Sequence, residues 1–239
     1  MKKIKKALIS VSDKKNLKEL LKNLTKHNIQ LISSGGTYKK IKKLKFKCLE
    51  VSDYTGSPEI LNGRVKTLHP KIHAGILSKR NNKSHNKDLK NNNFEEIDLV
   101  IVNFYPFEQT LNQTNNHLKI IENIDVGGPT MVRAAAKNYN DVTVITSSKQ
   151  YNELINEINK YKGSTSLEFR QKMSLEAFSE TAYYDAVISN YFNKIRNNYF
   201  PEKKIIFGNL IEKLRYGENP HQQAGIYSYG QNLWKTIKL

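Results

Sequence analysis

The stretch IDLVIVNF, residues 97–104, places four aliphatic residues in a row directly after Asp98. A half-exposed strand would alternate apolar with polar residues, whereas a strand that is covered on both faces is apolar throughout. Similar short apolar runs are KALISV (6–11), IQLISS (29–34), FKCLEV (46–51) and DVTVIT (141–146). We therefore predict a buried, mostly parallel β-sheet.

Helical patterns separate these strands. Leu17, Leu20, Leu21 and Leu24 recur at helical spacing, and further helices are expected at about 37–44, 128–138, 149–161 and, as one long helix, 166–196. Alternation of strands with helices predicts an α/β fold, a mostly parallel sheet flanked by helices with a long C-terminal helix. Residues 52–80 are expected to be irregular. The pattern weakens over 198–213, and a new unit is expected to start at 214.

The chain of 239 residues carries a formal net charge of +17, which favours anionic partners. Residues 1–50 hold 15 Lys against Asp13, Glu19 and Glu50, but only two aromatic residues, Tyr38 and Phe46. A nucleic-acid surface would interleave aromatic side chains with the basic ones. We therefore interpret the lysines as a solvated surface and expect no specific nucleic-acid partner.

Cys48 is the only cysteine, which excludes a disulfide framework and a cysteine metal cluster. The N-terminal apolar run ALISV is shorter than the 7–15 residues or so of a secretory signal. No run approaches the roughly 20 apolar residues that a membrane helix needs. These features predict a cytoplasmic protein with no membrane partner.

In a parallel α/β sheet, ligands bind at the carboxyl ends of the strands. There the sequence places SVSDKK (10–15), SSGGT (33–37) and NFYPF (103–107). Two glycines at the start of a helix let an anion approach free N–H groups, and Ser34 and Thr37 add hydroxyls. Lys14 is expected just inside a helix, where an anion would offset its unfavourable position. The alternative is ordinary turns with Ser12 and Thr37 as N-caps.

The stretch NGRVKTLHPKIHAGIL (62–77) is too rich in Gly and Pro for a helix and too charged for a buried strand. Arg64 and Lys66 share one side of an extended segment, which suits an anion. His69 and His73 have the spacing of a helical metal pair, but Pro70 argues against that geometry and no third ligand is evident. A solvated basic loop remains the simpler alternative.

In IDVGGPTMVRAAAKN (124–138), Asp125 precedes two glycines and a predicted helix, on which Arg133 and Lys137 share a face. A lysine near a carboxylate and a second cation could take part in proton transfer. The residues thus predict a protein that binds a phosphorylated small molecule, and they do not identify the reaction.

Together the segments SVSDK, SSGGT, GRVKTLHPKIHAGIL, NFYPF, IDVGGPTMVRAAAKN and LRYGENPHQ resemble one family in order and spacing. That family is the bifunctional purine-biosynthesis enzyme AICAR transformylase/IMP cyclohydrolase. The resemblance extends to about Tyr227. It implies a methylglyoxal-synthase-like cyclohydrolase domain over 1–197, a linker over 198–213 and the truncated start of a transformylase domain over 214–239.

The resemblance implies closure of the purine ring of FAICAR to give IMP and water, without metal or cofactor. It implies four catalytic residues, Lys137, Lys66, Asp125 and Tyr105. It also implies a nucleotide site formed by Ser12, Asp13, Lys14, Ser34, Gly35, Gly36, Thr37, Arg64, Val65, Lys66, Thr67, Asn103, Asp125, Val126 and Gly127. His69 and His73 are expected to be structural.

In the second domain, Arg215 and Tyr216 match AICAR-binding positions. The co-substrate there would be formyl-tetrahydrofolate, but the family's catalytic Lys–His pair lies beyond Leu239, so no formyl transfer is expected. Residues 214–239 are expected to be disordered without their packing partners. The resemblance further implies a homodimer. A non-catalytic nucleotide-binding regulatory module of the same fold remains the alternative.

Overall fold

The computed structural model describes residues 1–228, which form two compact units. The first unit comprises residues 1–181, and the second begins at Ala182. The long helix α10 (Leu167–Ile195), which the sequence predicts, runs across this boundary.

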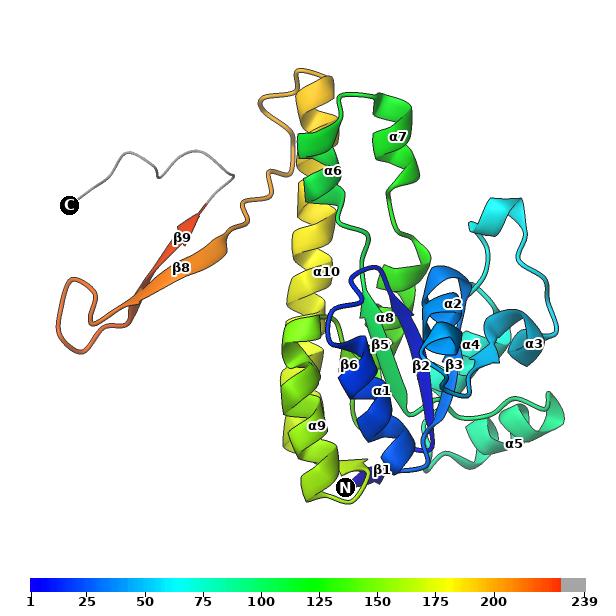
Figure 1. Ribbon diagram of the computed structural model, residues 1–239. Coiled ribbons are helices and arrows are strands. Elements are labelled where there is room, and N and C mark those ends of the chain that lie inside the picture. The colour runs from blue at the N-terminus through cyan, green and yellow to red at the C-terminus, as the bar shows by residue number, and fades with distance from the viewer. Residues whose placement is uncertain (229–239) are drawn as a thin grey trace. The chain divides into compact units, whose positions relative to one another are not determined.

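The first unit is built on a five-stranded parallel sheet with the strand order β4-β3-β2-β5-β6 (Figure 1). Its strands are β2 (Lys6–Val11), β3 (Gln30–Ser33), β4 (Leu49–Glu50), β5 (Leu99–Asn103) and β6 (Thr143–Ile145). The predicted α/β fold class is confirmed. The apolar run at 97–104 pairs with the central strand, with Leu8 opposite Val100, and both side chains are fully buried.

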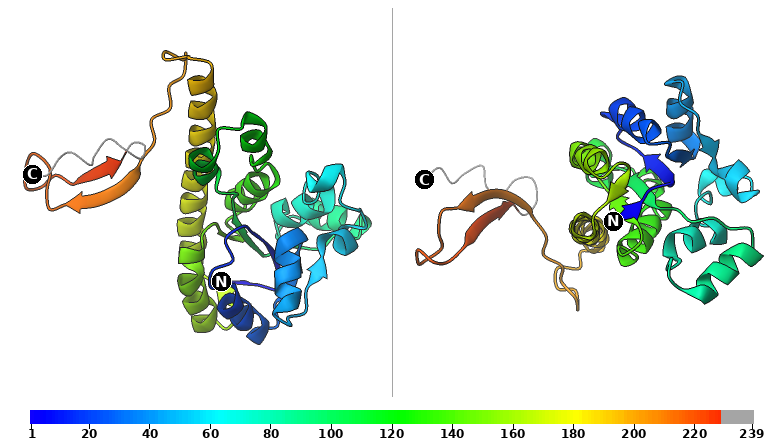
Figure 2. Two further views of the ribbon diagram at one scale, coloured as in Figure 1. Left: turned by 45° about the horizontal axis from the view of Figure 1, so that its top comes forward. Right: turned by 90° about the horizontal axis from the view of Figure 1, so that it is seen from below.

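Helices cover both faces of the sheet (Figure 2). Helix α1 (Leu17–Lys26) packs against α9 (Tyr151–Lys160), and α8 (Gly127–Lys137) packs on β5, on β6 and against α4 (Pro70–Leu77). The four leucines at helical spacing in α1 are all buried. Because parallel strands all end at one edge, this double cover leaves the carboxyl edge of the sheet as the accessible place for a ligand.

The expected extent of the strand at 46–51 is wrong. The run FKCLEV (46–51) forms only the two-residue strand β4, and Val51 already begins helix α3 (Val51–Thr55). Tertiary packing overrides the β-propensity there, since Val51 and Tyr54 are buried on the helix. Helix α2 (Gly35–Lys43) lies between β3 and β4, as the glycine-rich turn predicts.

The second half of 62–77 forms helix α4, which the sequence reasoning excluded. Pro70 occupies the first turn, where its missing N–H costs nothing, and the Nδ1 atom of His69 accepts a hydrogen bond from the backbone N–H of Lys71 at 3.1 Å. His69 is therefore a helix cap, and the proline starts the helix instead of breaking it.

Three helices lie in segments with no clear apolar period: α5 (Lys83–Asn91), α6 (Phe107–Gln113) and α7 (His117–Glu122). Asn82 caps α5 and Asn116 caps α7 through their side chains. Conversely, Lys14 does not lie inside a helix: α1 begins at Leu17, after Asn16 in a left-handed conformation. The remaining elements of this unit are β1 (Lys2–Lys3), which pairs with β7 (Ser164–Thr165), and the short 3-10 helices η1 (Leu61–Gly63) and η2 (Ser148–Gln150).

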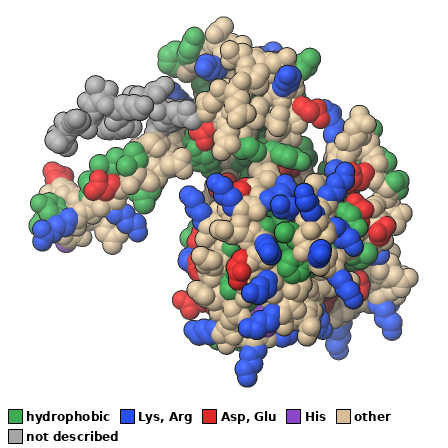
Figure 3. Space-filling view, viewed as in Figure 1, with side chains coloured by type: hydrophobic (Ala, Val, Ile, Leu, Met, Phe, Trp, Pro, Cys, Tyr) green, Lys and Arg blue, Asp and Glu red, His purple; other side chains and the backbone are tan. Residues whose placement is uncertain are grey.

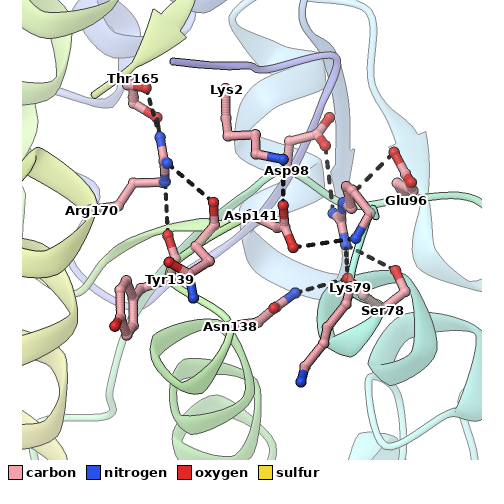
Figure 4. A network of polar contacts seen from close by, with 12 residues as sticks. Lys2, Ser78, Lys79, Glu96, Asp98, Asn138, Tyr139, Asp141, Thr165 and Arg170 are labelled. Atoms are coloured by element: carbon pink, nitrogen blue, oxygen red, sulfur yellow. Dashed lines mark hydrogen bonds and ion pairs between the residues drawn. The ribbon is translucent and has the colours of Figure 1, made fainter. Parts of the chain in front are cut away.

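The amino edge of the sheet is closed by a polar network (Figure 4). Asp98 accepts hydrogen bonds from the backbone N–H groups of Lys5 at 2.8 Å and Lys6 at 3.1 Å, and it pairs with Arg80. Arg170 is almost fully buried and donates to the carbonyls of Tyr139 and Thr165. These charges are satisfied by protein groups, so this edge is structural.

On the face seen in Figure 3, many Lys and Arg side chains lie over the first unit, and Asp and Glu side chains lie mainly toward its sides. That this surface is only solvated, as the sequence predicts, remains a prediction.

The second unit contains the hairpin of β8 (Asn209–Leu214) and β9 (Ala224–Ser228). The Tyr183 ring lies edge-on to the Phe207 ring at 5.1 Å, and the Asn209 side chain donates to the Tyr183 hydroxyl at 3.0 Å. Residues 214–228 are thus ordered in this hairpin, contrary to expectation, and 229–239 lie outside the described residues. The predicted linker and domain limits at 197 and 213 remain predictions.

Candidate active site

A pocket of about 580 Å³ opens at the carboxyl edge of β2, β3 and β5. It brings together most of the residues that the sequence reasoning selected. Those that line it are Ser12, Lys14, Ser34, Gly35, Gly36, Thr37, Arg64, Lys66, Thr67, Asn103, Tyr105, Asp125, Val126 and Gly127.

Asn103, at the end of β5, holds the loop that follows β2. Its Oδ1 atom accepts hydrogen bonds from the backbone N–H groups of Ser12 at 2.6 Å and Asp13 at 3.0 Å. The Ser12 hydroxyl also donates to the Phe104 carbonyl at 2.6 Å. The amide of Asn103 thus shapes the loop that presents Lys14 to the pocket.

The N-terminus of α2 forms the opposite wall. Ser34 is its N-cap residue in extended conformation, and Gly35 follows with φ +52°. The Thr37 hydroxyl is committed to the end of β2, because it accepts from the N–H of Val11 at 3.0 Å and donates to its carbonyl at 2.9 Å. The first N–H groups of the helix therefore offer the anion site here, and Thr37 contributes its backbone.

A short hairpin places Arg64 and Lys66 in the pocket wall. Ile60 and Val65 pair as an isolated antiparallel bridge, and Leu61, Asn62 and Gly63 between them all have positive φ. Two non-glycine residues in the left-handed region are a strained arrangement of the kind found at functional sites. Lys66 pairs with Glu59 at 3.1 Å, and Arg64 pairs with Glu122.

The start of α8 supplies a half-buried carboxylate. The Oδ1 atom of Asp125 accepts a hydrogen bond from the Gly128 N–H at 2.8 Å. Burial raises the pKa of Asp125 above its usual value, while backbone N–H groups of Gly128 and Tyr105 act in the opposite direction. A carboxylate with a raised pKa in a pocket is suited to accept a proton near neutral pH.

Glycines at this turn allow close approach. A Cβ at Gly127 would lie 2.8 Å from the Thr67 hydroxyl, and one at Gly128 would collide with the Asp125 carboxylate. Thr67 is buried, and its carbonyl accepts a hydrogen bond from the backbone N–H of His69 at 2.9 Å. His69, the cap of α4, therefore contacts a residue of the pocket wall, and the structural role expected of His73 remains a prediction.

Three predicted residues of the first unit do not line the pocket: Asp13, Val65 and Lys137. Asp13 accepts hydrogen bonds from the Ser148 hydroxyl and the Lys15 N–H, both at 3.0 Å, and these hold its pKa below the usual value. Lys137 is exposed and ends α8, ten residues beyond Gly127. At 1.5 Å per residue it lies about 9 Å along the helix from Met131, the last residue of α8 that lines the pocket.

Arg215 and Tyr216 belong to the second unit, where they follow β8 in the hairpin. Both are exposed. Their predicted role in AICAR binding remains a prediction.

Sequence reasoning missed several residues of the wall. They are Ser10, Val11, Asn62, Gly63, Ile121, Glu122, Asn123, Ile124, Gly128 and Met131. Most directly flank a motif that was selected, so a wider window around each motif would have included them. Glu122 has no such signal, because its role depends on the tertiary approach of α7 to the hairpin.

Over residues 1–228, no cluster of three or more His, Cys, Asp or Glu side chains could hold a metal ion. In the same range, no helix has both the length and the apolar character to cross a bilayer.

Two family models match the chain. Residues 16–130 match the MGS-like domain, and residues 135–238 match the AICARFT/IMPCHase bienzyme. The bifunctional purine biosynthesis protein PurH of Persephonella marina is 50% identical over 225 residues, which is 93% of this chain and 44% of that protein. PurH of Bradyrhizobium diazoefficiens is 46% identical over 94% of this chain and 42% of that protein.

Among solved structures, the crystal structure of ForH superposes with a TM-score of 0.71 at 28% identity, covering 79% of this chain and 99% of that one. The chain spans less than half the length of the curated relatives that it matches.

Proposed function

We propose, from the premise that this chain belongs to the family of the AICARFT/IMPCHase bienzyme, that its pocket closes the purine ring of FAICAR to give IMP and water. The observation that carries the proposal is the convergence of Lys66, Tyr105 and Asp125 on one pocket with an anion site at the N-terminus of α2.

The anion site accounts for the nucleotide phosphate. The N-terminal N–H groups of α2 and the nearby Lys14 give a positive potential there, and the glycines of α2 admit a bulky oxyanion. The phosphate would then fix the nucleotide in the pocket that Lys66, Tyr105 and Asp125 also line.

In the reaction, the carboxamide nitrogen attacks the formyl carbon, and the resulting carbinolamine loses water. An amide nitrogen is a poor nucleophile, so Asp125 orients it and accepts its proton. The ammonium of Lys66 stabilises the developing oxyanion, an effect of about 10²–10³ in rate per donor. Tyr105 can move a proton to the departing hydroxide, an effect of about 10²–10⁴.

Lys137 does not line the pocket, but it lies only six residues beyond Met131 on α8, and its catalytic role remains part of the proposal. Its ammonium would serve as the proton donor or acceptor that the resemblance implies.

The test is conversion of FAICAR to IMP by the purified 239-residue chain without folate or added metal. Turnover that disappears in Lys66→Ala supports the proposal. Binding of IMP with no turnover would instead favour a nucleotide-binding regulatory module, and absence of both would refute the assignment of the pocket.

A further inference from the structure

Lys66 is held by a carboxylate outside the set of expected site residues. Its Nζ atom lies 3.1 Å from Oε2 of Glu59. Of the two side chains, 29% of Lys66 and 35% of Glu59 are exposed, so this ion pair is more shielded than the Arg64–Glu122 pair, with 65% and 60% exposed. The Coulomb energy of a charge pair depends more strongly on the distance between the charges when the pair is partly buried, because the effective dielectric constant is lower.

The contact follows from the backbone. Ile60 donates its N–H to the Val65 carbonyl at 3.3 Å, and Val65 returns its N–H to the Ile60 carbonyl at 3.4 Å. In an antiparallel ladder the residues on either side of such a pair are themselves opposite each other. Glu59 and Lys66 are those residues, so the hairpin itself sets the carboxylate across from the ammonium.

Two glycines from separate segments leave space for the end of the lysine. A Cβ at Gly63 would lie 2.6 Å from Cε and 2.9 Å from Nζ of Lys66, and also 3.4 Å from the Glu59 carboxylate. A Cβ at Gly35 would lie 3.0 Å from the same Nζ atom. Glu59 thus holds the ammonium beside the first residue of α2, in a cradle that side chains would fill.

This position is unfavourable for a cation in isolation, because the helix N-terminus carries partial positive charge. An ammonium has three N–H donors, and Glu59 occupies only one side of it. The carboxylate can therefore keep Lys66 in place while donors remain for a ligand oxygen.

We propose that Glu59 is a positioning residue of the cyclisation site, which fixes the ammonium of Lys66 against Gly35 for contact with the reacting oxygen. The inference rests on the proposed function. Misplacement of a catalytic group by about 1 Å can cost about 10²-fold in rate. Loss of Glu59 should therefore lower kcat and leave KM nearly unchanged.

The experiment compares Glu59→Gln, Glu59→Asp and Glu153→Gln in the 239-residue chain. Glu153 is the matched control: it also pairs with a lysine, Lys172, at 2.7 Å, but lies outside the pocket lining. We expect Glu59→Gln to lower kcat for FAICAR about 10–10²-fold with KM nearly unchanged. We expect Glu59→Asp, which keeps the charge, to recover part of kcat, and Glu153→Gln to match the wild type.

Unchanged kcat in Glu59→Gln would overturn the inference, as would a loss of kcat that parallels a fall in the thermal midpoint. Failure of Glu59→Asp to exceed Glu59→Gln would do the same.

A second readout does not depend on cyclisation. Limiting acetic anhydride should acetylate Lys66 several-fold faster in Glu59→Gln than in the wild type, because the ammonium is no longer held by a carboxylate. Mass spectrometry measures this at Lys66, with Lys172 in Glu153→Gln as the reference. If the wild type fails to turn over FAICAR, the proposed function fails, and unchanged acetylation of Lys66 would separately refute the role of Glu59.

Discussion

Arg64 donates from two guanidinium nitrogens to one carboxylate, that of Glu122, with Nε 3.2 Å from Oε1 and Nη2 bonded to Oε2. This fork is the surface with which an arginine binds an anion in bidentate fashion. The Glu122 carboxylate therefore binds the same guanidinium nitrogens of Arg64 that are expected to bind the nucleotide.

Glu122→Gln should strengthen IMP binding by a few-fold at most. Both side chains are largely exposed, and exposed pairs are weak and screened by salt. Isothermal titration at low and high salt measures the effect, which should shrink as salt rises. Weaker IMP binding in the variant would show that Glu122 assists the ligand instead of competing with it.

Lys66→Ala should reduce turnover of FAICAR by about 10²–10³, because it removes one oxyanion donor. Lys71→Ala is the matched control from the same stretch. Lys71 lies over the Tyr54 ring, with Nζ 4.9 Å from the ring centroid, and does not line the pocket. Steady-state kinetics distinguish the two variants, and equal losses would contradict the assignment of Lys66.

Burial raises the pKa of Asp125. On acidification, turnover should therefore fall at a pH above the usual pKa of an aspartate. The raised pKa also favours protonation in the folded state, so its stability contribution is present at low pH and is lost as pH rises through the folded pKa. The free energy of unfolding of the wild type, relative to Asp125→Asn, should therefore increase as pH falls from neutral. Denaturant titrations across this range test the sign, and the variant should have little turnover.

Gly35→Ala and Gly36→Ala should differ although the glycines are adjacent. Gly35 has φ +52°, and its Cβ would press on the Lys66 ammonium; the left-handed backbone alone costs about 1–2 kcal/mol. A Cβ at Gly36 meets nothing within 4 Å, and alanine there should stabilise the helix by about 0.5–1 kcal/mol. The thermal midpoints of the two variants measure this difference in stability. Equal destabilisation by both substitutions would contradict the prediction.

His73 should make the fold sensitive to mild acid. Desolvation by burial lowers the pKa of its imidazole below the usual 6.5, against a smaller effect of the Thr67 carbonyl. A depressed pKa contributes stability above the usual value that is lost as pH falls through the folded pKa. The loss of thermal midpoint on acidification below about pH 6.5 should be smaller in His73→Gln than in the wild type. His117→Gln, at an exposed position, should behave like the wild type.

The strands and the motifs at their ends could be predicted because both depend on local sequence. Four consecutive aliphatic residues after Asp98 suffice to identify β5, and a parallel sheet then brings its end next to those of β2 and β3. Helix α4 was missed because Pro70 was interpreted as a breaker, although a proline in the first turn is favourable.

The carboxylates could not be predicted in the same way. Glu59 meets Lys66 only because a four-residue hairpin loop with three left-handed residues sets the register. Asn62 and Gly63 favour positive φ, but nothing in the sequence indicates it at Leu61. Glu122 meets Arg64 across 58 positions, and no local pattern encodes such a contact. The separation of Lys137 from the pocket lining follows from helix geometry, once Met131 is known to line the wall.

The bond from the Ser12 N–H to Asn103 joins residues 91 positions apart. Contacts of such long range form slowly, since the intervening chain must first be ordered. The loop that presents Lys14 therefore acquires its shape only when β5 has joined β2. During refolding, recovery of nucleotide binding should follow assembly of the sheet and not the earlier formation of helices, which makes the ligand a probe of the final folding step.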